Sequence, residues 1–406
     1  MSLLLLSILP IVFHLIIIIF YITTTKLLHF RENEEAYHLT MPIKMKKLFK
    51  ICLFASIFLF VMIAVLVLMG KGTLVGIPLS AAFLLLSLGI RLHPFLKGFT
   101  FTVVIFSSVS LAMFYPGLFI EIGTFKPKVL IIPLLQIIMF GMGTTMSMQD
   151  FLGVLKMPKA VVVGLLCQFT IMPFLGFGLA KLFNFPPEIA AGVILIGCAP
   201  SGLASNVMSY IANANVPLSV TLTAIATIAA PFITPFLMQQ LAGQYIPIDL
   251  WKMMLDIANM VILPIGAGLI FNYFFHGKAK WLDLAMPIIS MAGIAIIVTI
   301  ITANGRDGLL QVGLSLILAA ILHNLLGYFL GYLGGKLAGL NQRDCRTVAI
   351  EVGMQNAGLA SGIALTMNKI ATVGLAAAVF GPWMNISGSS LATWWRSIPI
   401  KEDGDK

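Results

Sequence analysis

A glutamate stands in one of the most apolar stretches of the chain, "EVGMQNAGLASG" at residues 351–362. The longer segment "TVAIEVGMQNAGLASGIALTM" holds no other charged residue, so Glu351 has no basic partner in its own helix. A carboxylate inside a membrane span costs about 2.5–3.5 kcal/mol on insertion scales, and such acids by default bind cations or carry protons. A protonated or hydrogen-bonded structural glutamate is the alternative interpretation.

The neighbours of Glu351 favour a metal cation over a proton. Gly353 and Gly358 flank Gln355 and Asn356. Glycine lets a helix unwind and expose its backbone carbonyls, which membrane proteins tolerate only where the backbone lines a site. Amide side chains supply hard, neutral oxygen ligands. We therefore predict a broken helix that surrounds a cation here.

A second segment of similar character is "GCAPSGLASN" at 197–206. Pro200 cannot donate a backbone hydrogen bond and disrupts the preceding turn, so a second broken helix is predicted. Ser205 and Asn206 add two oxygen ligands.

Other polar side chains in the spans are less specific signals. In the next helix, "LSVTLT" places Ser219 and Thr223 on one face. Taken alone, these hydroxyls and Gln168 are more typical of helix–helix contacts than of a site. His323 favours a structural hydrogen bond over a place in a polar lining.

Composition defines the class of protein. Of 406 residues, 59% are hydrophobic and only 10% are charged, whereas soluble proteins average about 25% charged residues. Apolar runs near 20 residues indicate an all-α polytopic membrane protein. We attribute the net charge of +10 to lysines and arginines in cytoplasmic loops and not to a nucleic-acid-binding surface. The four cysteines have no metal-ligand or disulfide spacing, and no nucleophile–base pair indicates an enzyme.

Thirteen spans are predicted. They cover 3–24, 50–69, 74–91, 98–116, 128–146, 158–181, 187–209, 216–239, 250–273, 284–303, 309–334, 345–367 and 371–394. The first has no basic flank or cleavage site, so we interpret it as a retained helix and not as a signal peptide. With the N-terminus outside and the C-terminus cytoplasmic, 18 of the 25 lysines and arginines fall inside and 7 outside, as the positive-inside rule requires. Residues 25–49 form a polar, basic linker that meets lipid headgroups.

An internal repeat relates two parts of the chain. "FLGFGLAK" at 174–181 resembles "FLGYLGGK" at 329–336, 155 residues later, and "GLAS" recurs at 202–205 and 358–361. The predicted spans give the two copies opposite orientations in the membrane, which is the inverted-topology repeat of many secondary transporters. We predict two five-helix halves, with three further helices at the N-terminus.

These motifs resemble the bile acid:sodium symporter family over roughly 96–396. The matching stretches are "FGMG" at 140–143, "GCAPSGLASNVMSY" at 197–210, "LSVTLT" at 218–223 and "EVGMQNAGLASG" at 351–362. Members of this family are sodium-coupled transporters of organic anions, with a panel domain and a core domain in which two broken helices cross. The resemblance implies the same ten-helix architecture here.

The resemblance also implies two sodium sites that share Glu351. One would use the side chains of Ser205, Asn206, Ser219, Thr223 and Glu351. The other would use Gln168, Glu351, Gln355 and the backbone carbonyls of Val352 and Met354. Two bound cations would then allow Glu351 to stay ionised.

Substrate in the family binds at the crossing, here near Asn356 and Gly358. Two helix N-termini, which start near Leu203 and Ala357, would direct their positive ends at an anion. Leu203 and Ala204 are therefore also expected to contact the substrate. The sequence departs from the family at Ser201, where glycine is common, and at Leu203, where a small polar residue is common. Both departures lie next to the substrate region.

The sequence thus predicts a sodium-coupled symporter of an organic anion, such as a carboxylate or a bile-acid-like or sulfonated molecule, in a plasma membrane. Its expected parts are an extension at 1–95, a transporter core at 96–396 with repeats at 96–243 and 244–396, and a cytoplasmic tail at 397–406. Sodium is co-transported, the partners are the substrate anion and the bilayer, and no nucleic acid or organic cofactor is expected. A sodium/proton or anion antiporter and a membrane sensor or scaffold are the alternatives.

Overall fold

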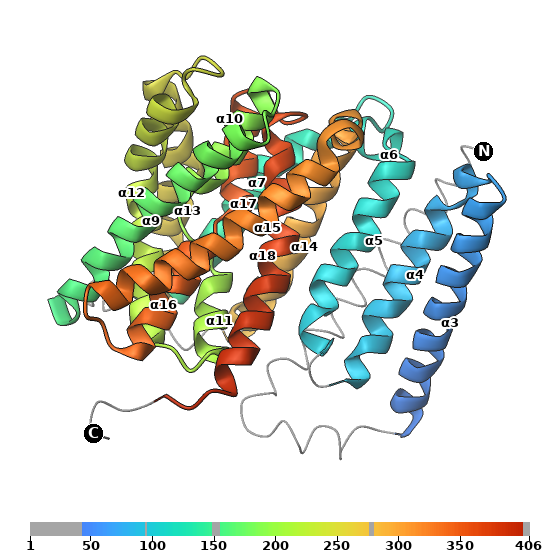
Figure 1. Cartoon of the computed structure of the whole chain (residues 1–406), viewed down its shortest axis with the longest axis horizontal. Helices are drawn as coiled ribbons and strands as arrows, with labels where there is room; N and C mark the ends of the chain where they lie inside the picture. Colours follow the sequence, from blue (N-terminus) through green and yellow to red (C-terminus); the bar gives the residue numbers. More distant parts are fainter. Residues whose placement is uncertain (1–42, 94–95, 148–154, 276–279, 401–406) are drawn as a thin grey trace. The chain divides into compact units, whose positions relative to one another are not determined.

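The computed structural model describes residues 43–93, 96–147, 155–275 and 280–400. Helices make up nearly all of its regular structure (Figure 1). In the described part of the chain, eight helices are long and apolar enough to cross a membrane. Large apolar side chains are exposed on their surfaces, such as Phe54 at 69% and Leu68 at 86%, as expected where lipid replaces water. The chain is an all-helical polytopic membrane protein.

Each span predicted from residue 50 onward coincides with a helix or a pair of half-helices. The span predicted at 3–24 and most of the predicted linker lie outside the described residues. Helix α3 (Ile43–Leu68) begins earlier than expected, so the assignment of residues 43–49 to a linker is wrong. Four of its first eight residues are lysines. Lysine is a good helix former, and its long side chain lets the ammonium group reach the membrane interface.

The chain divides into two compact units, the first of which lies within residues 1–115 and 275–296. It contains α3, α4 (Gly76–Gly89), α5 (Thr100–Phe114) and the first part of α14 (Lys280–Asn304). Buried hydroxyls join neighbouring helices. The Ser56 hydroxyl donates to the Ala82 carbonyl over 2.9 Å, and the hydroxyls of Ser80 and Ser107 are 2.8 Å apart. Small polar residues of this kind let helices approach closely without a hydrophobic driving force.

The second unit lies within residues 116–274 and 297–406. Its helices are α6 (Gly117–Ile120), α7 (Ile131–Thr145), α9 (Pro158–Leu182), α10 (Pro187–Cys198), α11 (Ala204–Ile211), α12 (Val216–Ala242), α13 (Leu250–Phe275), the end of α14, α15 (Arg306–Leu337), α16 (Gln342–Gly353), α17 (Ala357–Thr366) and α18 (Val373–Arg396). All of the predicted site residues belong to this unit. The predicted boundaries at residues 95, 243 and 396 stay predictions.

The 155-residue spacing of the sequence repeat recurs in the fold. Helices α10 and α16 each have 12 residues and begin 155 residues apart. Asn184 and Gly339, which follow α9 and α15, have the same spacing and left-handed φ values of 48° and 70°. Asn213 and Asn368, which follow α11 and α17, repeat the pattern with φ values of 53° and 57°. Asparagine and glycine adopt this conformation more readily than other residues. These pairs support the repeat, while the opposite orientation of its halves stays a prediction.

Both predicted helix breaks are present, and they are hydrogen-bonded to each other. Helix α10 ends at Cys198 and α11 begins at Ala204, whereas α16 ends at Gly353 and α17 begins at Ala357. The backbone nitrogen of Gly202 donates to the Met354 carbonyl over 3.1 Å, and that of Asn356 donates to the Pro200 carbonyl over 2.8 Å. A short antiparallel bridge thus joins Ser201 to Gln355 and satisfies backbone groups that the breaks free.

Candidate functional site

Glu351 lies two residues before the end of α16 and is 2% exposed. Its carboxylate accepts hydrogen bonds from three hydroxyls. Ser219 donates to Oε1 over 2.5 Å, while Ser201 and Thr223 donate to Oε2 over 2.6 and 2.9 Å. Hydroxyl donors around a carboxylate favour its ionised form, which accepts at both oxygens. The structure therefore supplies Glu351 with polar partners from the first break and from α12.

Asn206 joins the same cluster from α11. Its side-chain oxygen Oδ1 lies 2.8 Å from the Ser219 hydroxyl and 3.2 Å from the Thr223 hydroxyl. Ser205 lies 3.3 Å from the Thr223 hydroxyl and also donates to the Gly202 carbonyl over 2.8 Å. The five side chains predicted for one sodium site thus meet in a single cluster, in which Asn206 is partly exposed and the other four are buried.

The residues predicted for the other site form a second group beside the crossing. Gln168 of α9 donates its amide to Gln355 Oε1 over 2.7 Å and to the Ala199 carbonyl over 3.0 Å. Gln355 donates to the Val352 carbonyl over 2.6 Å. The Met354 carbonyl accepts from Gly202 and keeps a second lone pair. Both Glu351 oxygens, by contrast, bond to hydroxyls of the first cluster.

Both clusters contain little charge apart from Glu351. Within the described residues, no lysine or arginine forms an ion pair with Glu351, and the two ion pairs found there, Arg306–Asp307 and Lys369–Glu188, lie at helix ends. A buried carboxylate without a basic partner is costly unless a cation or several donors compensate it. The oxygen-rich surroundings provide that compensation and fit a hard monovalent cation.

Residues predicted to contact substrate lie at the starts of the second half-helices. Leu203 precedes α11, which begins at Ala204. Asn356 precedes α17, and its side chain caps that helix by accepting from the Leu359 backbone nitrogen over 2.9 Å. Gly358 lies in the first turn, where an added Cβ would be 3.4 Å from Asn356 Oδ1. The arrangement presents two helix N-termini beside the crossing.

Two polar contacts of the site are not predicted by the sequence. Ser201 stands out there only as a departure from the resembled family, yet its hydroxyl binds Glu351. The amide of Asn324, in α15, donates to the Gly353 carbonyl over 2.7 Å at the end of α16. Its neighbour His323 makes the structural contact favoured by the sequence, with Nε2 3.0 Å from the Met172 carbonyl. The signal that could have found Asn324 is the polar pair that it forms with His323 in the middle of an apolar helix.

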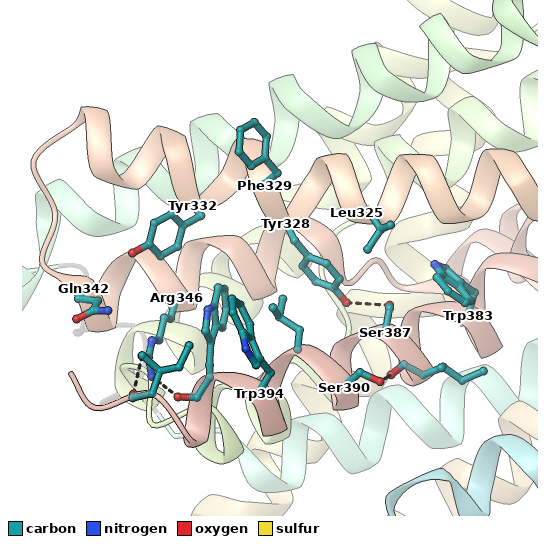
Figure 2. A pocket seen from close by; sticks show the side chains of 14 residues that line it. Leu325, Tyr328, Phe329, Tyr332, Gln342, Arg346, Trp383, Ser387, Ser390 and Trp394 are labelled. Carbon is teal, nitrogen blue, oxygen red and sulfur yellow. Dashed lines mark hydrogen bonds between the residues drawn. The ribbon is translucent and has the colours of Figure 1, made fainter. Parts of the chain in front are cut away.

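A separate pocket of about 810 Å³ is lined by residues of α15, α16 and α18 and by Ile398 (Figure 2). Aromatic side chains such as Tyr332 and Trp394 line it, and none of the predicted site residues does. Arg346 at its edge donates to the carbonyls of Ala212 and Trp395, each over 2.9 Å, and to that of Ile398 over 3.0 Å. Carbonyls at the ends of α11 and α18 thus accept hydrogen bonds from this arginine, which gives it a structural role.

Comparisons with known proteins identify the family of the chain. Residues 132–312 match the family model described as the sodium bile acid symporter family. An uncharacterized sodium-dependent transporter of Bacillus subtilis, YocS, is 40% identical over 310 residues, which are 76% of this chain and 95% of that protein. A probable chloroplastic sodium/metabolite cotransporter of Arabidopsis thaliana, BASS1, is 38% identical over 268 residues, covering 66% and 67% of the two chains. The similarly named protein of rice is 33% identical over 311 residues, which are 75% of this chain and 74% of that protein.

Proposed function

The chain belongs to the sodium bile acid symporter family, and on that premise we propose that it is a sodium-coupled symporter of a small organic anion. The names of its relatives describe sodium-dependent transport and sodium/metabolite cotransport. Membership of a transporter family also argues against an enzymatic role. The observation that carries the proposal is the buried carboxylate of Glu351. It accepts hydrogen bonds from three hydroxyls, and in the described part of the chain it has no basic partner.

One sodium ion binds between Ser205, Asn206, Ser219, Thr223 and Glu351. The hydroxyls that now donate to Glu351 keep free lone pairs, so each can direct an oxygen at a cation while its proton stays on the carboxylate. A second ion binds at Gln168, Gln355, Glu351 and the carbonyls of Val352 and Met354. The amides of Gln168 and Gln355 exchange hydrogen bonds with each other, and rotation of these side chains turns both oxygens toward the ion.

Sodium links α11, α12 and α16 and thereby stiffens the crossing. The substrate anion then binds near Asn356, Gly358, Leu203 and Ala204, where the N-termini of α11 and α17 provide partial positive charge. Movement of the core against the panel exposes the site to the cytoplasm. With two sodium ions and a monoanion, one net charge crosses per cycle, which supplies about 2.3 kcal/mol at 100 mV.

The substrate is a carboxylate or a bile-acid-like or sulfonated molecule, and the membrane is a cell membrane. A sodium/proton or anion antiporter is the rival mechanism, in which Glu351 takes up and releases a proton in each cycle. The neutral oxygen atoms gathered around Glu351 favour the symporter, because they can complete the coordination of a sodium ion that balances the carboxylate charge.

Transport by the full chain in liposomes separates these mechanisms. Purified protein is first screened for carboxylates and sulfonates that raise its thermal stability in the presence of sodium. Uptake of the best anion is then followed under an inward sodium gradient at several pH values. The symporter requires external sodium and depends only weakly on pH. Uptake that follows a proton gradient without sodium supports the antiporter, and absence of uptake for every stabilising anion supports a sensor or scaffold.

A further inference from the structure

A polar residue that is absent from the resembled family's ligand pattern contacts the proposed sodium site at Glu351. Ser201 is 1% exposed and lies in the break between α10 and α11, where it belongs to neither helix. Its hydroxyl donates to Glu351 Oε2 over 2.6 Å and lies 3.4 Å from Thr223 Oγ1. Both partners belong to the cluster described above.

The backbone on either side of Ser201 fixes its position. The carbonyl of Pro200 accepts from Asn356, and the amide of Gly202 donates to Met354. These two bonds hold Ser201 opposite Gln355 across the crossing. The backbone of Ser201 therefore cannot move far from Glu351 without disrupting the bridge between the two broken helices.

Ser201 resembles Ser219 and Thr223, and differs from Ser205 and Asn206, in that its hydroxyl donates to the carboxylate of Glu351. The Ser205 hydroxyl is shared with the Gly202 carbonyl, and the Asn206 oxygen lies beside two hydroxyls. The Ser201 hydroxyl donates to the carboxylate and keeps lone pairs for a cation held by Glu351 Oε2.

We propose that the Ser201 hydroxyl is an additional oxygen ligand of the sodium ion bound between Glu351 and Thr223, in the first of the two proposed sites. It raises the affinity of this site for sodium. The proposal rests on the proposed function. It also links sodium occupancy directly to the bridge between the two breaks, because the same residue contacts the ion and pairs with Gln355.

The test uses the purified full chain with Ser201→Gly, Ser201→Ala and the control Ser209→Ala. Ser209 is a buried serine of α11 whose hydroxyl has no partner among the described residues. For each protein, the sodium concentration that gives half of the maximal thermal stabilisation is measured at constant ionic strength with choline as the replacement cation. Both Ser201 variants are expected to need about tenfold more sodium, the usual order for loss of one contact to a charged group, and Ser209→Ala is expected to match the unmodified protein.

A ligand role and a purely structural role predict opposite changes. If Ser201 only stabilised the carboxylate when no cation is bound, its removal would leave the sodium midpoint unchanged or lower it. Either result overturns the proposal while leaving sodium binding by the unmodified protein intact. A Ser201 variant that melts at a lower temperature than the unmodified protein in the absence of sodium does not affect the test, since only the sodium concentration at half-maximal stabilisation is compared. Two variants, Ser201→Gly and Ser201→Ala, are used so that the test can still be made if one of them does not fold. Absence of any sodium effect in the unmodified protein overturns both this proposal and the proposed function.

Discussion

The carbonyl oxygen of Pro200 accepts a hydrogen bond from the backbone nitrogen of Asn356 over 2.8 Å. One of these residues precedes α11 and the other precedes α17, so the bond joins the two helix breaks directly. Backbone groups freed by a break inside a membrane must find partners within the protein. Here each break supplies partners to the other, and the geometry of one depends on the geometry of the other.

The two hydroxyls of α12 should contribute separately to sodium affinity. Ser219 and Thr223 lie one turn apart, and each contacts both Glu351 and Asn206. We expect Ser219→Ala and Thr223→Ala each to weaken sodium binding about tenfold, since each removes one ligand and one hydrogen bond to a charged group. Sodium-dependent thermal stabilisation measures the effect.

Thr227→Ala is the matched control, because Thr227 is buried on the same helix and its hydroxyl donates to the Thr223 carbonyl over 2.6 Å rather than to the carboxylate. It should keep the sodium affinity of the unmodified protein. An unchanged sodium midpoint in both Ser219→Ala and Thr223→Ala would argue that α12 does not line the site.

Asn324 should stabilise the end of α16. Its amide donates to the Gly353 carbonyl, and its oxygen accepts from the Ser387 hydroxyl over 2.5 Å. Asn324→Leu removes the partner of two buried polar groups, at a cost of about 1–3 kcal/mol in the free energy of unfolding.

Thermal unfolding in detergent checks this expectation. The control is Asn385→Leu, since Asn385 donates to a carbonyl of its own helix, that of Gly381, and is only partly buried. Equal losses of stability in the two variants would contradict a special role for Asn324.

Gly353 allows Tyr328 to pack against the end of α16. A Cβ atom added at Gly353 would lie 2.2 Å from the Tyr328 ring. Gly353→Ala must therefore displace a buried ring or the helix end, which costs about 1–3 kcal/mol of stability. We expect a lower melting temperature and, because Gly353 adjoins Val352 and Met354, weaker sodium binding as well.

Gly178→Ala provides the comparison, since Gly178 is also helical and no heavy atom outside its own helix lies within 4 Å of the added Cβ in the described part of the chain. Alanine there should be neutral or slightly stabilising. A Gly353→Ala protein as stable as Gly178→Ala would show that the crossing accommodates the extra methyl group.

Much of the fold follows from local pattern. Apolar runs of the right length identify the spans. Pro200 with Gly202 and Gly353 with Gly358 indicate the breaks because they accompany polar residues in the middle of a span, whereas Pro173, Pro231 and Pro235 lie inside continuous helices. The oxygen-bearing side chains of the first cluster were also predictable as a set, through the resemblance to a family and the helical spacing of Ser219 and Thr223.

Other features depend on partners far away in the sequence. Nothing next to Ser201 indicates that its hydroxyl contacts Glu351, 150 residues later. Asn324 forms a polar pair with His323 in an apolar helix, but nothing near it in the sequence indicates that it contacts Gly353. The start of α3 at Ile43 is hard to predict for a different reason. Lysines are a weak sign of a loop, because lysine is a good helix former and its long side chain can reach the membrane interface from within a helix.

The most direct test of the account is the response of Glu351→Gln to sodium. Glutamine keeps the size and polarity of the side chain but removes the charge that attracts a cation. Melting temperatures of the two purified proteins are compared across a sodium series at constant ionic strength. We predict that sodium stabilises the unmodified protein and has no effect on Glu351→Gln beyond that of choline. Equal stabilisation of both proteins by sodium would contradict the assignment of Glu351 as the shared cation ligand.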